Sequence, residues 1–231
     1  MVKYIWVIIM EKPLDTILFD LDGTLLDSNE IIVQSYMHAY KEHLNHLDID
    51  RQSIVDDIGP PLETIFRKHT SDEKIINALY ESYLGYYVKH EKGLLKAYDG
   101  VIDTLKRLKT QNYNLAIVTS KFYSSAEPSI KMFNLERYFT VISTLDNVEN
   151  PKPAKDACLH ALSQFKTTNR AIMIGDNMSD IESGKNAGIL TAGVAWSIKG
   201  KDVLKTAEPD YMLETIEDIF KILEKENGGQ S

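Results

Sequence analysis

The sequence lacks the features of several protein classes. It has one cysteine in 231 residues, Cys158, and therefore cannot form an intramolecular disulfide or a zinc site built from several cysteines. Its 26 Lys and Arg residues are outnumbered by 34 Asp and Glu residues, which gives a formal net charge of −8. Because non-specific nucleic-acid binding depends on positive charge, this balance argues against a nucleic-acid partner.

Long apolar runs are also missing. The N-terminal stretch MVKYIWVIIMEKP is shorter than the roughly 20 residues that a membrane-spanning helix needs, and it lacks a small-residue cleavage site. We therefore expect residues 1–13 to be an N-terminal extension, with no membrane partner. The low cysteine content fits a reducing compartment, so we expect a cytoplasmic protein. Nothing in the sequence indicates its oligomeric state.

Four short apolar runs predict buried strands. They are rich in Val, Ile and Phe, show no polar alternation, and cover residues 16–20, 114–120, 170–176 and 191–196. Such runs are typical of parallel strands that are covered on both faces. Helical patterns alternate with them from about residue 98, which predicts a doubly wound α/β fold. In this fold class, reactive groups gather beyond the carboxyl ends of the strands.

The segment 28–95 has a different pattern. It reads as helix throughout, with a break where Gly59 is followed by Pro60 and Pro61. We expect an all-helical cap domain at residues 28–95, inserted into a catalytic core formed by residues 14–27 and 96–231. A stripe of Tyr80, Tyr83 and Tyr87 at helical spacing predicts packing inside this cap rather than a substrate platform.

Chemically active side chains follow the predicted strands. In DLDGT, two carboxylates lie two residues apart, so they can point to the same side of an extended chain, and their mutual repulsion calls for a cation. VTS offers hydroxyl and amide groups, PKP holds a lysine between prolines, and GDNMSD brings two further carboxylates one helical turn apart. The candidate residues are Asp20, Asp22, Thr119, Ser120, Lys152, Asp176 and Asp180.

Taken in this order, the four motifs resemble those of the haloacid dehalogenase (HAD) superfamily. The resemblance implies a Rossmann-like core with an inserted helical cap, and a phosphohydrolase that acts through an aspartyl-phosphate. Asp20 would then be the nucleophile. Asp22 would protonate the leaving oxygen and later activate water.

The resemblance also implies the binding groups. Mg²⁺ would be the cofactor, with Asp20, Asp176 and the backbone carbonyl of Asp22 as its ligands. Thr119, Ser120 and Lys152 would bind the transferred phosphoryl group. Asp180 would orient Lys152 or a metal-bound water.

Longer segments indicate a branch of the family. The dehalogenases lack an aspartate at the position of Asp22, which favours a phosphatase or phosphotransferase. DDIGPPLETIF, TLDNVENPKP and TAGVAWSIKGKDVLKTAEPDYMLE resemble the bacterial HAD-type inorganic pyrophosphatases. The substrate would be pyrophosphate or another small phosphorylated molecule. Phosphoglycolate phosphatase and other phosphomonoesterases are the alternative, followed by a β-phosphoglucomutase-like enzyme or a non-catalytic binding protein.

Some residues keep two interpretations at this point. Lys121 follows the VTS motif and could contact an anion or be solvated. Candidates for substrate selection in the cap follow from position alone: Gly59 to Leu62, Thr64, Arg67 and Lys68. Cys158, within an amphipathic helix, is expected to serve packing.

Overall fold

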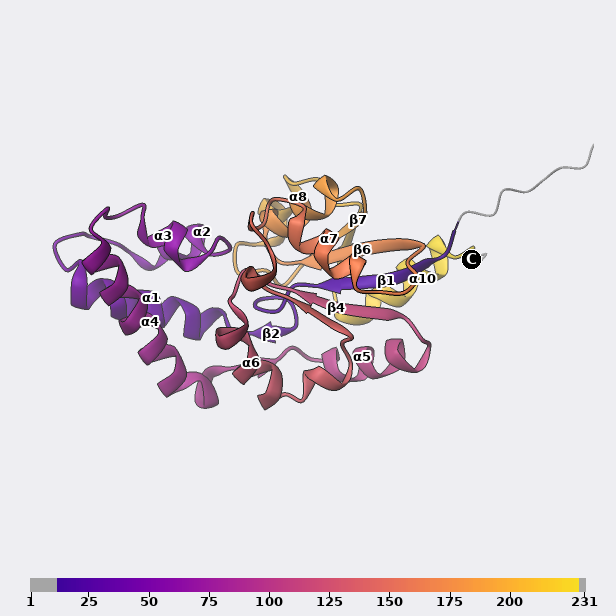
Figure 1. Cartoon of the computed structure of the whole chain (residues 1–231), viewed down its shortest axis with the longest axis horizontal. Helices are drawn as coiled ribbons and strands as arrows, with labels where there is room; N and C mark the ends of the chain where they lie inside the picture. Colours follow the sequence, from indigo (N-terminus) through magenta and orange to yellow (C-terminus); the bar gives the residue numbers. More distant parts are fainter. Residues whose placement is uncertain (1–11, 229–231) are drawn as a thin grey trace, which may run out of the picture.

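Six parallel strands form the central sheet of the computed structural model, which describes residues 12–228 (Figure 1). In spatial order they are β5 (Val141–Ser143), β4 (Asn114–Val118), β1 (Leu14–Phe19), β6 (Arg170–Gly175), β7 (Leu190–Val194) and β8 (Tyr211–Leu213). The four predicted apolar runs are confirmed as the four central strands. The edge strands β5 and β8 have three residues each, too few to establish a pattern in the sequence.

Helices cover both faces of the sheet. Successive strand residues point to opposite faces, so Ile17 of β1 packs in the cluster that contains α5 (Val101–Thr110) and α10 (Ile219–Glu226). Leu18 packs on the other face, where α7 (Asp156–Ser163) contributes Cys158. Burial raises the pKa of this thiol to about 11, and the predicted packing role of Cys158 is confirmed.

Further helices and 3₁₀ turns connect the strands. They are α6 (Tyr123–Met132), α8 (Met178–Asn186), α9 (Lys201–Lys205) and the 3₁₀ turns η1 (Leu135–Arg137), η2 (Leu145–Asn147) and η3 (Ile216–Asp218). Residues 1–11 of the expected N-terminal extension lie outside the described residues. Within residues 12–228, no helix combines the length and the apolar character that a bilayer crossing requires.

A group of helices lies beyond the carboxyl end of β1 (Figure 1). It consists of α1 (Asn29–His43), α2 (Arg51–Asp57), α3 (Leu62–Phe66) and α4 (Glu73–Leu94). The predicted break is confirmed, because α2 ends before Gly59 and α3 begins after Pro61. The chain enters this group through β2 (Leu26–Asp27) and leaves it through β3 (Lys96–Ala97), and these two short strands pair with each other.

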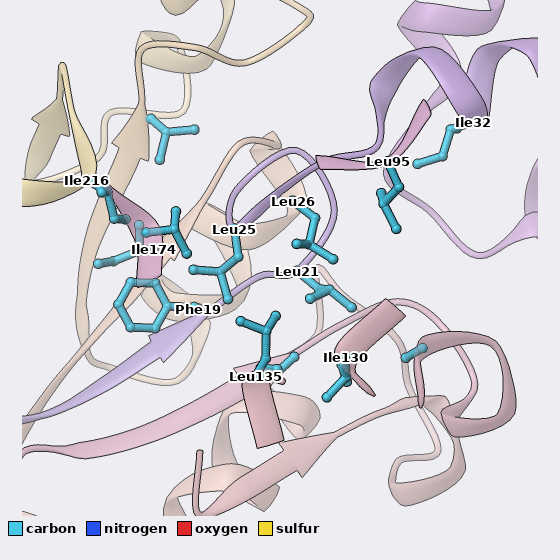
Figure 2. Close-up of a cluster of buried hydrophobic side chains, with 14 of the residues drawn as sticks. Phe19, Leu21, Leu25, Leu26, Ile32, Leu95, Ile130, Leu135, Ile174 and Ile216 are labelled. Atoms are coloured by element: carbon cyan, nitrogen blue, oxygen red, sulfur yellow. The ribbon is translucent and has the colours of Figure 1, made fainter. Parts of the chain in front are cut away.

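Apolar side chains connect the sheet to the first helix of this group. Figure 2 shows Leu21 and Leu25 in the loop after β1 and Leu26 at the start of β2, between Phe19 of β1 and Ile32 of α1. All three leucines are fully buried. The loop that carries the two aspartates of DLDGT is therefore anchored by its own leucines.

An aromatic cluster forms the interior of the helical group. The ring of Phe66 contacts those of Tyr36, Tyr40, Tyr80 and Tyr83, with centroids 5.7 to 6.4 Å apart. These are edge contacts, which add to the free energy gained from burying the rings. Phe66 is fully buried, and its ring contacts connect α3 with α1 and α4.

We predict that Phe66→Ala lowers the free energy of unfolding by about 3–5 kcal/mol, because it removes a fully buried ring and leaves a cavity. Leu159→Ala is the control, since Leu159 is 41% exposed, and should cost no more than about 0.5 kcal/mol. Urea unfolding followed by circular dichroism measures both changes. Equal losses in the two variants would show that the aromatic cluster contributes little.

Candidate active site

The functional site lies where three neighbouring strands end. β4, β1 and β6 are adjacent and parallel, so the residues that follow them meet at one edge of the sheet. A cavity of about 260 Å³ opens there. All seven residues that the motifs predict line it: Asp20, Asp22, Thr119, Ser120, Lys152, Asp176 and Asp180.

Lys152 binds the first aspartate of DLDGT. Its Nζ donates to Asp20 Oδ1 at 2.7 Å, to Asp180 Oδ1 at 2.5 Å and to the carbonyl of Val118 at 3.0 Å. Burial lowers the pKa of Lys152, but the carboxylates of Asp180 and Asp20 outweigh it and raise that pKa above its ordinary value. The ammonium is therefore a fixed positive charge, and its three hydrogen bonds fix its position.

Three buried carboxylates surround this lysine. Asp20, Asp176 and Asp180 each have an oxygen within 4.8 Å of the others. Burial raises the pKa of Asp20 to about 7 although Lys152 opposes it. Burial, together with the charges of Asp20 and Asp180, raises the pKa of Asp176 well above its ordinary value. Three carboxylates facing one ammonium leave an excess of negative charge.

The cluster fits a hard divalent cation, because such ions prefer carboxylate oxygens and would offset this charge. Asp180 differs from the other two carboxylates. Its Oδ1 accepts from Lys152, and its Oδ2 accepts from the backbone N–H of Asn177 at 3.0 Å. Since both of its oxygens have donors, Asp180 is suited to holding Lys152 in place, and Asp20 and Asp176 are better placed to bind a cation.

Asp22 faces a different lysine. Lys121 Nζ lies 2.9 Å from Asp22 Oδ1 and 2.8 Å from Asp22 Oδ2, and it also donates to the hydroxyl of Tyr87 at 3.2 Å. The side chain of Asp22 is not part of the carboxylate cluster. The expected contribution of Asp22 to a metal site, through its backbone carbonyl, stays a prediction.

The loop between the two aspartates is shaped by a glycine. Gly23 has a φ of +80°, and a Cβ there would lie 2.3 Å from Asp176 Oδ2. Only glycine allows the backbone to pass this close to the Asp176 carboxylate. The turn after β1 therefore packs directly against the side chain of Asp176, which follows β6.

Hydroxyl groups line the floor of the cavity. Thr119 is 4% exposed, and its Oγ1 accepts from the backbone N–H of Lys121 at 3.3 Å. Within the described part of the chain, the buried hydroxyls of Ser120 and Ser179 have no hydrogen-bond partner. Both line the cavity, so they are available to a ligand. The motif analysis missed Ser179, although it lies between Asp176 and Asp180 in GDNMSD.

The loop between α2 and α3 touches the core directly. Asn177 Nδ2 donates to the carbonyl of Ile58 at 2.7 Å. Gly59 has a φ of +130°, and a Cβ there would lie 2.4 Å from the same Asn177 nitrogen. This close approach brings Gly59, Pro60 and Leu62 into the cavity wall, as their positions in the sequence suggested.

The two cationic candidates of this segment point elsewhere. Arg67 binds Glu63 and Glu73, and Lys68 binds Asp57 at 2.6 Å, all on partly exposed surface. Neither residue lines the cavity, and neither does Thr64. The spacing of Glu63 and Arg67 at i, i+4 was a signal for the first ion pair, whereas Lys68 and Asp57 are brought together by the turn between α2 and α3.

The tyrosine stripe has two roles. Tyr83 and Tyr87 are buried and their rings stack 6.3 Å apart, which confirms the predicted packing. Together with Tyr80 they also line the cavity, which the sequence analysis had treated as the less favoured alternative. The wall that the helices contribute also includes the apolar side chains of Ile32, Leu62, Leu84 and Val88 and the buried side chain of Glu91.

Comparison with known proteins identifies relatives along nearly the whole chain. A sequence model of haloacid dehalogenase-like hydrolases matches residues 17–194. Pyrophosphatase PpaX of Listeria innocua is 39% identical over 94% of this chain and 100% of its own, and pyrophosphatase PpaX of Bacillus velezensis is 40% identical over 92% and 97%. The crystal structure of a predicted phosphatase from Clostridium acetobutylicum superposes with a TM-score of 0.78 at 29% identity, covering 92% of this chain and 99% of that one.

We predict that Gly23→Ala weakens the binding of a divalent cation by the carboxylate cluster, because the added methyl group displaces the Asp176 carboxylate. Gly188→Ala is a matched control: Gly188 also has a positive φ, +72°, but a Cβ there meets nothing within 4 Å. Both variants should lose about 1 kcal/mol of stability through backbone strain, and only Gly23→Ala should lose affinity in a calorimetric Mg²⁺ titration. If Gly23→Ala bound the cation as tightly as wild type, Asp176 would not be one of its ligands.

Proposed function

Since the chain belongs to the family of haloacid dehalogenase-like hydrolases, we propose that it is a Mg²⁺-dependent phosphohydrolase whose substrate is inorganic pyrophosphate. The observation that carries the reaction class is the buried Asp20, held by Lys152 at 2.7 Å beside the other carboxylates. The pyrophosphatases that align with nearly the whole chain support the substrate. We further propose that the enzyme acts in the cytoplasm on this small molecule and not on nucleic acid.

Asp20 is the proposed nucleophile. Its carboxylate attacks one phosphorus atom, the new O–P bond forms, and the bond from that phosphorus to the bridging oxygen breaks. The electron pair goes to the bridging oxygen, which takes a proton from Asp22 and leaves as inorganic phosphate. The reaction thus becomes two displacements, each easier than direct hydrolysis.

Asp22 serves both displacements. After the first phosphate leaves, Asp22 takes a proton from water as the water oxygen attacks the phosphorus of the aspartyl-phosphate. The bond from phosphorus to Asp20 then breaks, which restores the carboxylate and releases the second phosphate. Asp20 and Asp22 line the same cavity, as this alternation of roles requires.

The other motif residues bind the transferred group. Lys152, the hydroxyl of Thr119 and the backbone of Ser120 would hold its oxygens, and Asp180 would keep Lys152 in place. Asp20, Asp176 and the backbone carbonyl of Asp22 would bind Mg²⁺. When bound, the ion neutralises negative charge on the carboxylates and on the phosphoryl group.

We also propose that residues 28–95 are a cap domain on a core made of residues 14–27 and 96–231. The pairing of β2 with β3 supports this division, because it brings the two chain crossings together at Leu26–Asp27 and Lys96–Ala97. A cap at this place excludes water from the reacting groups when it closes.

A second candidate substrate is a small phosphomonoester such as 2-phosphoglycolate. The apolar side chains that the helices place in the cavity wall favour it, because an organic leaving group would contact them more favourably than a phosphate would. The two candidates share the same nucleophile, proton donor and metal site and differ only in the leaving group.

The substrate is tested by measuring phosphate release from pyrophosphate and from 2-phosphoglycolate side by side in the presence of Mg²⁺. We expect the higher kcat/KM with pyrophosphate. A higher value with 2-phosphoglycolate would reassign the substrate and leave the mechanism in place.

The nucleophile is tested with Asp20→Asn. We expect kcat to fall by ~10⁴-fold or more, because an amide cannot form the phosphoenzyme. Radiolabelled substrate should leave an acid-stable label on the wild-type protein and none on the variant. Substantial turnover by Asp20→Asn would contradict the mechanism.

The metal is tested by removal. Excess chelator should abolish turnover, and added Mg²⁺ should restore it, because the carboxylate cluster lacks a sufficient counter-charge without a cation. Turnover that persists with excess chelator would remove the metal from the reaction.

A further inference from the structure

Two lysines bring positive charge into the cavity. Within residues 12–228, Lys121 and Lys152 are the cationic side chains that line it. Lys152 is committed to Asp20, Asp180 and the carbonyl of Val118. Lys121 has no part in the mechanism described above, yet its side chain is only 18% exposed and its ammonium faces the interior.

We propose that Lys121 binds the leaving phosphate of pyrophosphate and that Tyr87 holds its ammonium in position. This inference rests on the proposed function, since only a substrate with a second phosphate needs such a group. It makes Lys121 a residue that selects pyrophosphate over phosphomonoesters.

The place of Lys121 follows from the direction of the reaction. In phosphoryl transfer the attacking and leaving oxygens lie roughly in line, so the leaving group is on the side of phosphorus opposite to Asp20. Asp22 must come within hydrogen-bond distance of the leaving oxygen to protonate it. Lys121 Nζ lies 2.8 Å from Asp22 Oδ2. The Lys121 ammonium would therefore lie next to the leaving phosphate of a bound pyrophosphate.

The backbone of Lys121 is fixed on both sides. Its N–H donates to Thr119 Oγ1 at 3.3 Å, and its carbonyl accepts from the N–H of Leu145 at 3.0 Å. Thr119 belongs to the group that holds the transferred phosphoryl. The positions for the two phosphates are therefore set by residues two apart in one loop.

Tyr87 restrains the ammonium itself. Its hydroxyl accepts from Lys121 Nζ at 3.2 Å, and Nζ lies 4.6 Å from the centre of its ring. The ring is 5% exposed and stacks on Tyr83, so it has little freedom. Tyr87 comes from α4, and through it the helical group contributes to binding, although its two candidate cations, Arg67 and Lys68, form ion pairs outside the cavity.

Lys121 is charged when substrate arrives. Burial lowers its pKa, but the Asp22 carboxylate and the neighbouring tyrosines raise the pKa above its ordinary value. The ammonium has three donors and uses them on Asp22 and Tyr87. A phosphate carries more negative charge than a single carboxylate and offers several oxygens, so it competes well for these donors.

The test compares pyrophosphate with phenyl phosphate in wild type and Lys121→Met. Phenyl phosphate also needs a proton on its leaving oxygen, but its leaving group is uncharged. We expect kcat/KM for pyrophosphate to fall by ~10- to 100-fold, mostly through KM, and kcat/KM for phenyl phosphate to change by less than about threefold. Lys121→Arg should restore part of the loss.

Binding gives a second measurement that does not depend on turnover. Imidodiphosphate, a pyrophosphate analogue with a bridging N–H, should bind the Mg²⁺-loaded Lys121→Met variant ~10- to 100-fold more weakly than wild type in calorimetry. Tyr87→Phe should weaken it by a smaller factor, and serves as the second variant should Lys121→Met fail to fold. Lys68→Met, a lysine outside the cavity, is the control and should leave the affinity unchanged.

Equal losses for pyrophosphate and phenyl phosphate would overturn the inference, because they would mean that Lys121 acts only by positioning Asp22. Unchanged imidodiphosphate binding in Lys121→Met would also overturn it. A wild-type protein that hydrolyses phenyl phosphate but not pyrophosphate would instead refute the proposed substrate, and the role of Lys121 would fall with it.

Discussion

The mutual repulsion of three buried carboxylates is the constraint on which the rest of the site depends. Asp20, Asp176 and Asp180 are each at most 7% exposed and lie within 4.8 Å of one another. Burying like charges together is costly unless positive charge and hydrogen bonds accompany them. Lys152 supplies part of that charge, and the excess that remains creates the demand for a cation.

The fold makes this crowding possible through buried side chains and close backbone approaches. Leu21, which lies between Asp20 and Asp22 in the sequence, is fully buried in the apolar core, so the core holds the loop in place. Gly175 makes one such approach possible, because a Cβ at this position would lie 2.3 Å from the carboxyl carbon of Asp180. Gly23 does the same for Asp176. Because glycines stand at these two contacts, the three carboxylates can converge from the ends of β1 and β6 and from α8 without steric conflict.

The sequence predicts what short-range patterns encode. The strands β1, β4, β6 and β7 are long enough for a continuous apolar run to identify them, and the residues after three of them bring most of the motif side chains to one cavity. The edge strands were not predictable, because a three-residue strand gains its stability from its neighbour rather than from its own pattern. The partners of Lys121 were equally hidden. Asp22 and Tyr87 lie 99 and 34 residues away, and only tertiary structure brings them together.

The distribution of charge between core and helices bears on how substrate is chosen. The helical group places apolar side chains in the cavity wall and directs Arg67 and Lys68 to outward ion pairs. Among the described residues, positive charge for a second phosphate therefore has to come from the core, and Lys121 is the core lysine in the cavity that is not committed to Asp20 and Asp180. Lys121 contacts the hydroxyl and the ring of Tyr87 in α4. In the proposed arrangement, the helices therefore influence the leaving group by positioning Lys121 rather than by binding it with a charge of their own. The apolar part of this wall tolerates an organic leaving group, whereas the lysine favours an anionic one, so the proposed preference for pyrophosphate rests on a single ammonium.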